Sequence, residues 1–183
     1  MKPTFLAAEK QKKCEETAKE NGFQNCAQLK ENNLWFPWLK GFAEGVGYDQ
    51  SVGNPKNRTR SEKEAYESKS DTLNKIAKEG VGVKLINTTC YYAGRQTSNV
   101  TTLGCYDNYN PYIKTGVTSF SDVMFFIELK PEDSKAIGDV YKGDMFDFTA
   151  VVTRVEATYP MDGQSFNRDP VEIYAKGIKV KRY

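Results

Sequence analysis

The sequence predicts an α+β protein with a helical N-terminal region, residues 1–80, followed by a small antiparallel β-barrel, residues 81–183. Three observations lead to this prediction. The first segment is dense in Ala, Glu, Lys and Gln, which favour helix. Beyond Gly80, apolar and polar residues alternate, which is typical of strands. Two later apolar runs change face midway, as the strongly coiled strands of a small closed barrel do.

Composition limits the classes of function. A chain of 183 residues is long enough to bury a hydrophobic core. Its net charge of +2 is too small to indicate a polyanionic partner from bulk electrostatics. No apolar stretch approaches the roughly 18 residues that a membrane-spanning helix needs, so we expect a soluble chain that does not span a membrane.

The first two helices are predicted from their ends. Residues 4–21 contain no Pro and stop at an Asn-Gly pair, which is a common helix end. Asn25 is suited to cap a second, short helix that ends near Leu29. These helices would form a hairpin in which Cys14 and Cys26 face each other.

Both tryptophans of the chain lie close together in the following segment, and a helix is expected to begin near Pro37. The aromatic cluster has two interpretations. Trp35, Phe36 and Trp38 are candidates for contact with a partner, or they dock the helical region onto the domain that follows. Because large exposed apolar patches are rare on soluble proteins, docking is the favoured interpretation.

A third helix is expected to lead into the β-region. Residues 49–60 are rich in Gly, Asn, Ser and basic residues and should form an exposed loop. Ser61 and Glu64 have the spacing of a capping box, and the helix that they begin should stop at Gly80.

The four cysteines form two close pairs in the sequence. No Cys-x-x-Cys motif and no His is present, which disfavours a structural zinc site. The spacing favours the disulfides Cys14–Cys26 and Cys90–Cys105, with four free buried thiols as the alternative. Disulfides indicate a periplasmic or secreted protein whose signal sequence has been removed.

The first two predicted strands form a hairpin. Residues 81–92 and 100–106 are rich in β-formers and flank a turn at 94–99. If this turn is symmetric, Cys90 lies directly opposite Cys105, which is the main reason to expect a cross-strand disulfide.

A loop, a strand and a short helix follow. Residues 107–121 are rich in Asn, Tyr, Gly and Pro and should form a loop. Residues 123–129 are apolar on both faces, which indicates a central strand covered on both sides. Pro and two acids in the first turn predict a short helix over 131–137.

In each of the last two predicted strands, the apolar residues change from one face of the strand to the other partway along it. In residues 145–159, a bulge within 151–154 would reconcile two apolar runs that point to opposite faces. The final strand needs a bulge at Gly177 to bring Ile178 and Val180 into step with its earlier apolar residues.

Three strands, a short helix and two further strands make up the arrangement of an OB-type barrel. Residues from Phe125 to Lys181 resemble the tRNA-anticodon-binding-like OB superfamily, in which an apolar strand, a short helix, a Lys-Gly-Asp turn and a long strand recur. This resemblance implies a fold and no activity. An antiparallel sheet packed on helices is the alternative architecture.

The residue types present argue against an enzyme. Without His, Ser-His-Asp and Cys-His sites are excluded. The sequence also has no P-loop and no dinucleotide-binding fingerprint. We therefore expect no catalytic residues, no cofactor and no bound metal.

In OB-type domains the face of the second and third strands usually receives the ligand. This region of the sequence is rich in Tyr, whose rings can stack on bases or sugars. It also contains Arg and Lys, which can pair with phosphates or pack on aromatic rings. The candidate ligand-binding residues are Tyr91, Tyr92, Arg95, Tyr106, Tyr109, Tyr112 and Lys114. Alternatively, half of these rings simply fill sheet faces.

Two functions are consistent with these features. The first is a non-enzymatic extracytoplasmic binding or assembly protein that contacts another protein or a cell-envelope component. The second is a single-stranded nucleic-acid-binding OB protein, which the small net charge makes less favoured.

Overall fold

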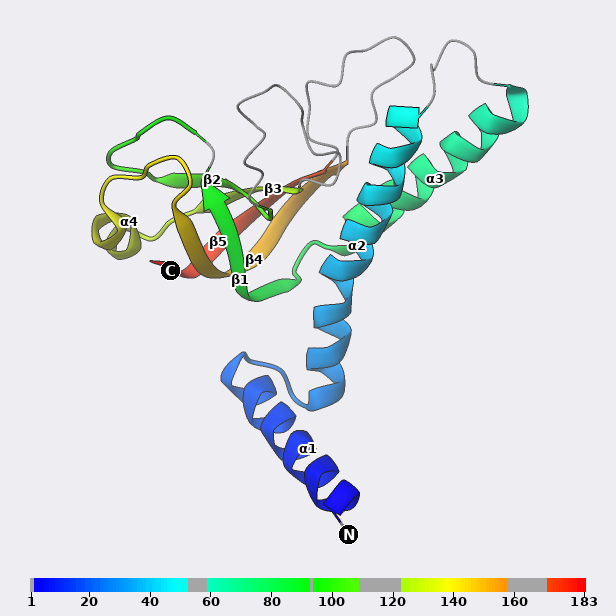
Figure 1. Ribbon diagram of the computed structural model, residues 1–183. Coiled ribbons are helices and arrows are strands. Elements are labelled where there is room, and N and C mark those ends of the chain that lie inside the picture. Colours follow the sequence, from blue (N-terminus) through cyan, green and yellow to red (C-terminus); the bar gives the residue numbers. More distant parts are fainter. Residues whose placement is uncertain (1, 53–58, 93, 109–122, 158–170) are drawn as a thin grey trace.

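The computed structural model describes residues 2–52, 59–92, 94–108, 123–157 and 171–183 (Figure 1). Helices at the N-terminal end precede a five-stranded β-structure, as the sequence predicts. In chain order the elements are α1 (Lys2–Glu20), α2 (Cys26–Val52), α3 (Arg60–Glu79), β1 (Lys84–Tyr92), β2 (Thr102–Tyr106), β3 (Val123–Glu128), α4 (Pro131–Ile137), β4 (Met145–Ala157) and β5 (Val171–Arg182).

Helix α1 ends where the Asn-Gly pair predicts. Gly22 has a φ of +83°, and the amide of Phe23 donates to the carbonyl of Ala18, so the helix closes with a left-handed residue that suits Gly. Asn25 accepts from the amide of Gln28 and caps α2 as expected. Figure 1 shows α1 projecting away from the β-structure, with the N-terminus at its far end.

Helix α2 differs from the prediction. A short helix to Leu29 and a new start near Pro37 were expected, but one helix of 27 residues contains Pro37. Proline forfeits one backbone hydrogen bond within a helix. Burial of Trp35, Leu39 and Ala43 at successive turns on one face offsets this loss.

The expected loop over 49–60 is also shorter, because α2 extends to Val52 and α3 begins at Arg60. The capping box of α3 uses Thr59 and Glu62 instead of Ser61 and Glu64. Both pairs have the same spacing, and the earlier one adds two residues to the helix.

The five strands close into a barrel in the order β1-β2-β3-β5-β4. Strands β3 and β5 are parallel, and every other neighbouring pair is antiparallel. Outside the register shifts in β1, β4 and β5, alternate strand residues point inward, which gives a continuous apolar interior. Phe125, Phe146 and Phe148 are the largest side chains within it, and the rings of Phe125 and Phe148 meet edge to face.

Both predicted bulges are present. Strand β4 shifts register between Val152 and Arg154, and the β4–β5 pairing also shifts between Thr149 and Ala150, where the partners change from Lys179 to Gly177. The second bulge brings Val180 inward, as expected. The prediction for Ile178 is wrong: its side chain is 38% exposed, because Gly177 takes the inward position and Ile178 is the extra residue.

Both predicted disulfides are present, Cys14–Cys26 and Cys90–Cys105. The predicted register of the second pair is wrong by two residues, since Cys105 lies opposite Tyr92 and not Cys90. The connection between β1 and β2 is not a symmetric turn, because Thr97 pairs with Val140. The two cysteines are therefore diagonal neighbours on the inner face of the barrel, with Cα atoms 5.5 Å apart.

The helices and the barrel share one buried cluster, which includes Trp35 and Leu39 of α2 and Ile76 of α3. The ring of Phe36 lies 5.5 Å from that of Phe125 inside the barrel. Lys40 of α2 forms an ion pair of 2.8 Å with Asp107, whose side chain is only 3% exposed.

The junction between α2 and β1 is also polar. The side-chain amide of Asn32 bonds both the backbone N–H and the carbonyl of Lys84, at 2.8 Å each. The ammonium of Lys84 donates in turn to the carbonyl of Asn21. These contacts fix the base of α1 and the start of α2 against the barrel.

Candidate binding face of the barrel

Two of the predicted tyrosines lie side by side on the outside of the barrel. Tyr91 of β1 and Tyr106 of β2 are partners across the two strands. Their neighbours Cys90 and Cys105 point inward and are fully buried, so the two rings point outward. Both tyrosines are partly exposed. The structure thus places these two candidates together.

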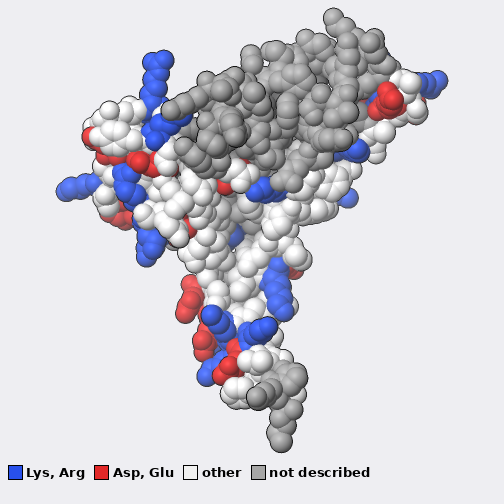
Figure 2. All heavy atoms as spheres, viewed as in Figure 1, with Lys and Arg blue, Asp and Glu red and all other residues white. Residues whose placement is uncertain are grey.

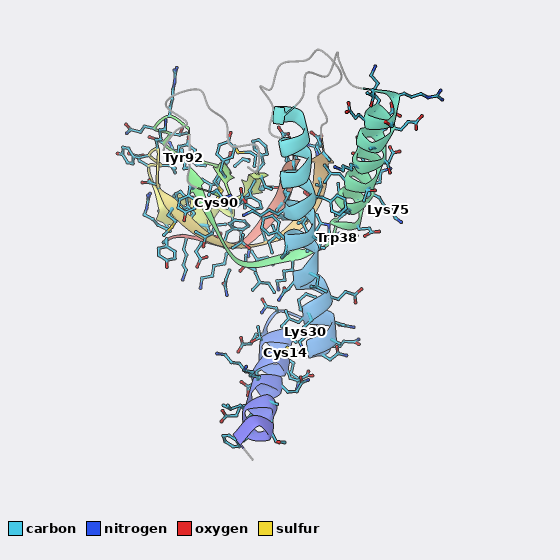
Figure 3. The ribbon with its side chains drawn as sticks, turned by 45° about the vertical axis from the view of Figure 1, so that its right-hand side comes forward. Cys14, Lys30, Trp38, Lys75, Cys90 and Tyr92 are labelled. Carbon is cyan, nitrogen blue, oxygen red and sulfur yellow. A yellow bond between two sulfur atoms is a disulfide. The ribbon has the colours of Figure 1, made fainter. Side chains whose placement is uncertain are left out.

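The other predicted residues are placed differently. Tyr92 packs against the core, and its hydroxyl donates to the carbonyl of Arg95 at 2.7 Å. The same hydroxyl lies 2.9 Å from that of Thr97, so Tyr92 organises the loop after β1 (Figure 3). Arg95 is exposed at this loop. The remaining candidates lie outside the described residues: Tyr109, Tyr112 and Lys114.

Strands β3, β5 and β4 continue the outer surface with residues that the sequence did not single out. Phe126 of β3 stacks on Tyr174 of β5, with ring centroids 4.9 Å apart and an interplanar angle of 17°. The guanidinium of Arg154 on β4 lies 3.9 Å from the centre of the Tyr174 ring. Tyr174 therefore makes a ring contact on one side and a cation–π contact on the other.

Strand register joins these residues into one surface. Tyr106 is opposite Met124, and Phe126 is opposite both Gly104 and Tyr174. We call this surface the aromatic face: Tyr91, Tyr106, Met124, Phe126, Tyr174 and Arg154.

Gly104 allows the side chains of the aromatic face to approach the backbone. A Cβ atom at this position would lie 3.0 Å from Cε of Met124 and 3.7 Å from the ring of Phe126. Because Gly104 has no side chain, Met124 and Phe126 lie close to the backbone of β2 at this position.

Carboxylates border the aromatic face. The Tyr174 hydroxyl donates to Glu172 at 3.0 Å, and Arg154 pairs with Glu156 at 2.7 Å. Partial burial and the hydrogen bond to Glu172 raise the pKa of the Tyr174 phenol above its usual 10.0, with the charges of Glu172 and Glu156 adding to the shift and Arg154 opposing it. The phenol is therefore a neutral hydrogen-bond donor at physiological pH.

The sequence held a weak signal for the missed residues. Tyr174 alternates with Ile173 and Ala175, so its outward direction follows from the strand pattern. What the pattern does not give is the parallel pairing of β3 with β5, which brings Phe126 against Tyr174.

The aromatic cluster of α2 is divided between interior and surface. Trp35 is 5% exposed, and its indole N–H donates to the carbonyl of Ile76 at 2.8 Å, so it docks α2 onto α3. Phe36 packs against the core. Trp38 is 47% exposed and lies where α2 passes α3 (Figure 3). Of the three candidates for partner contact, Trp38 has the exposure that such a role needs.

Within the described ranges, no group of three or more Cys, Asp or Glu residues is arranged to hold a metal ion. In the same part of the chain, no helix has the length and apolar character to cross a membrane. No protein-family model, curated protein or solved structure matches the chain.

Proposed function

We propose that this chain is a non-enzymatic binding protein of the periplasm or the secreted fraction, and that its OB-like barrel binds a polypeptide or another cell-envelope component through the aromatic face. The single observation that carries this proposal is a group of partly exposed rings in two neighbouring cross-strand rows of the outer surface. One row holds Tyr91 and Tyr106, followed by Met124, and the next holds Phe126 stacked on Tyr174. The outer face of the second and third strands is the surface that OB barrels use for ligands.

The topology supports the OB-type assignment. Five strands close in the order β1-β2-β3-β5-β4, and one short helix, α4, lies between the third and fourth strands. The two disulfides support a periplasmic or secreted location, since disulfides persist in oxidising environments.

The charges beside the face favour a ligand without phosphates. Glu156 and Glu172 are directly opposite each other at one end. Glu128, which lies on the same side of β3 as Phe126, is opposite Lys176 and adds no net negative charge. The Glu156–Glu172 pair would repel a nucleic-acid backbone, whereas stacked rings suit peptide side chains or sugars.

Single-stranded nucleic acid is the second candidate. Phe126 and Tyr174 form the kind of platform on which bases stack, and Arg154 beside them carries a positive charge.

A binding titration on the whole chain tests both candidates. The probes are extended peptides, soluble peptidoglycan fragments and a labelled single-stranded oligonucleotide. We expect a peptide or envelope fragment to bind, with little dependence on salt. Phe126→Ala should weaken that binding about tenfold or more, because it removes a central aromatic contact.

Two further variants sharpen the test. Arg154→Gln changes an exposed side chain of the aromatic face, so we expect the variant to fold normally. This variant should also weaken binding. Tyr183→Ala removes a ring that is 76% exposed at the end of β5, and it should leave binding unchanged. Equal affinity in the wild type and Phe126→Ala would reject the aromatic face. Steeply salt-dependent binding of the oligonucleotide alone would replace the first function with the second.

A further inference from the structure

The free end of α1 is exposed on all sides. Every residue from Thr4 to Lys13 is exposed, and the apolar side chains of Phe5 and Leu6 are 65% and 55% exposed. A helical end without tertiary contacts is marginally stable in water, and an exposed apolar pair adds an unfavourable surface. We call residues 4–13 the tip of α1.

A second unpartnered apolar surface lies at the base of the arm that α1 forms. A groove there is lined by Leu34 and Trp38 of α2 and by Val81, which precedes β1. These three side chains are 69%, 47% and 58% exposed. The charged residues that line the groove, Glu31 and Glu79, are both acidic.

The tip and the groove are complementary in charge and in spacing. Leu6, Lys10 and Lys13 share one stripe of α1, because they lie four and then three residues apart. Glu9 lies beside them, and the tip as a whole, with three Lys and one Glu, has an excess of positive charge. Glu31, Leu34 and Trp38 share one stripe of α2 for the same reason. If the helices pack antiparallel with Leu6 against Leu34, one turn further along Lys10 falls beside Glu31.

The tip cannot reach the groove of its own chain. The disulfide between Cys14 and Cys26 holds α1 to α2 near its C-terminal end, and the helix projects away from the barrel (Figure 1). From Leu6 to Glu20 an α-helix spans about 21 Å. Figure 2 shows both signs of charge around this arm, with largely uncharged surface where it joins the body.

We propose that the groove receives the tip of α1 from a second copy of this chain, in a two-fold symmetric dimer. Each tip fills the groove of the other copy, so the contact is made twice and the assembly closes. Phe5 and Leu6 supply the apolar anchors, and Lys10 forms an ion pair with Glu31 across the interface.

Sedimentation velocity of the full chain over a range of concentrations tests this dimer. We expect a monomer–dimer equilibrium in the wild type. Leu34→Asp should weaken dimerisation about tenfold or more, as loss of an interface anchor does. Tyr141→Asp is the matched control, because Tyr141 is 48% exposed on another part of the surface, and it should dimerise like the wild type. A wild type that stays monomeric, as expected if the groove binds another protein, would overturn the proposal, as would an unchanged equilibrium in Leu34→Asp.

Charge exchange and mixing identify the two surfaces as partners. Lys10→Glu and Glu31→Lys should each weaken the dimer, and the double variant should recover it. A tip variant, Phe5→Asp with Leu6→Asp, should form dimers with Leu34→Asp more readily than either does with itself, because mixing restores one intact contact. Failure of both recoveries would show that the tip and the groove do not meet. Circular dichroism of each variant checks that the exposed substitutions leave the fold intact.

Discussion

The barrel and the arm formed by α1 are held in opposite ways. Each barrel strand has two neighbours in a closed ladder, and the disulfide Cys90–Cys105 lies among fully buried side chains. The arm is held at one end, by the disulfide Cys14–Cys26 and by local caps, and its other end is exposed. Many long-range contacts therefore hold the barrel together, whereas the arm is anchored only near its base and its other end is exposed to solvent.

The two disulfides give the largest expected contrast. Replacing Cys90 and Cys105 by Ala opens a loop with a sequence separation of 15, which should lower the free energy of unfolding by about 3 kcal/mol. Replacing Cys14 and Cys26 should change urea unfolding of the barrel much less but should speed hydrogen exchange throughout α1. Equal losses in urea would contradict the contrast between the two regions.

The ion pair between Lys40 and Asp107 joins the helices to the barrel. Asp107 accepts the amide of Val123 with one oxygen and meets the Lys40 ammonium with the other. Lys40→Met leaves this buried carboxylate unpaired and should cost about 3 kcal/mol in urea unfolding. In the control Arg60→Met, which removes a pair that is almost fully exposed, stability should not change measurably. Similar effects in both variants would mean that the buried pair does not anchor α2.

A pair of glycines tests how tightly the helices pack on each other. A Cβ atom on Gly80 would lie 1.9 Å from the Trp35 ring, so Gly80→Ala should lose about 2 kcal/mol through overpacking. Gly41 has nothing within 4 Å of its Cβ position and lies inside α2, so Gly41→Ala should gain up to about 1 kcal/mol. Thermal unfolding measures both changes. Trp35→Phe should reduce the cost of Gly80→Ala, and additive effects would contradict a clash with Trp35.

The smallest expected effect concerns Tyr174. Its folded-state pKa is raised above that of the unfolded chain, so the stability that this phenol contributes is present below pH 10.0 and is lost as the pH rises through the folded-state pKa. Tyr174→Phe should abolish this part of the pH dependence. Glu172→Gln should lower the pKa of Tyr174, which carbon NMR of labelled tyrosine rings can follow. A Tyr174 pKa unchanged by Glu172→Gln would refute the role of that carboxylate.

Local signals predicted much of the fold. Some predictions rest on the backbone preference of a residue and need no distant contact. Examples are the Asn-Gly end of α1, Pro131 at the start of α4 and Gly177 at a bulge. Predictions that depended on distant contacts were less accurate. Pro37 indicated a helix start, but α2 is continuous through it, and the burial of Trp35, Leu39 and Ala43 on one face favours this continuity.

The candidate site shows the same division. Alternation along each strand determines that Tyr91, Tyr106 and Tyr174 point outward, and this can be read from the sequence because the period of a strand is two. Which outward residues become neighbours depends on strand order and register, and these follow from closure of the barrel. The sequence by itself thus determined most of the elements, the cysteine pairs and the face of most strand residues, but neither the continuity of α2 through Pro37 nor the exposure of Ile178. The tertiary structure alone decided that Phe126, Tyr174 and Arg154 meet, because residues far apart in the chain are brought together only by long-range pairing.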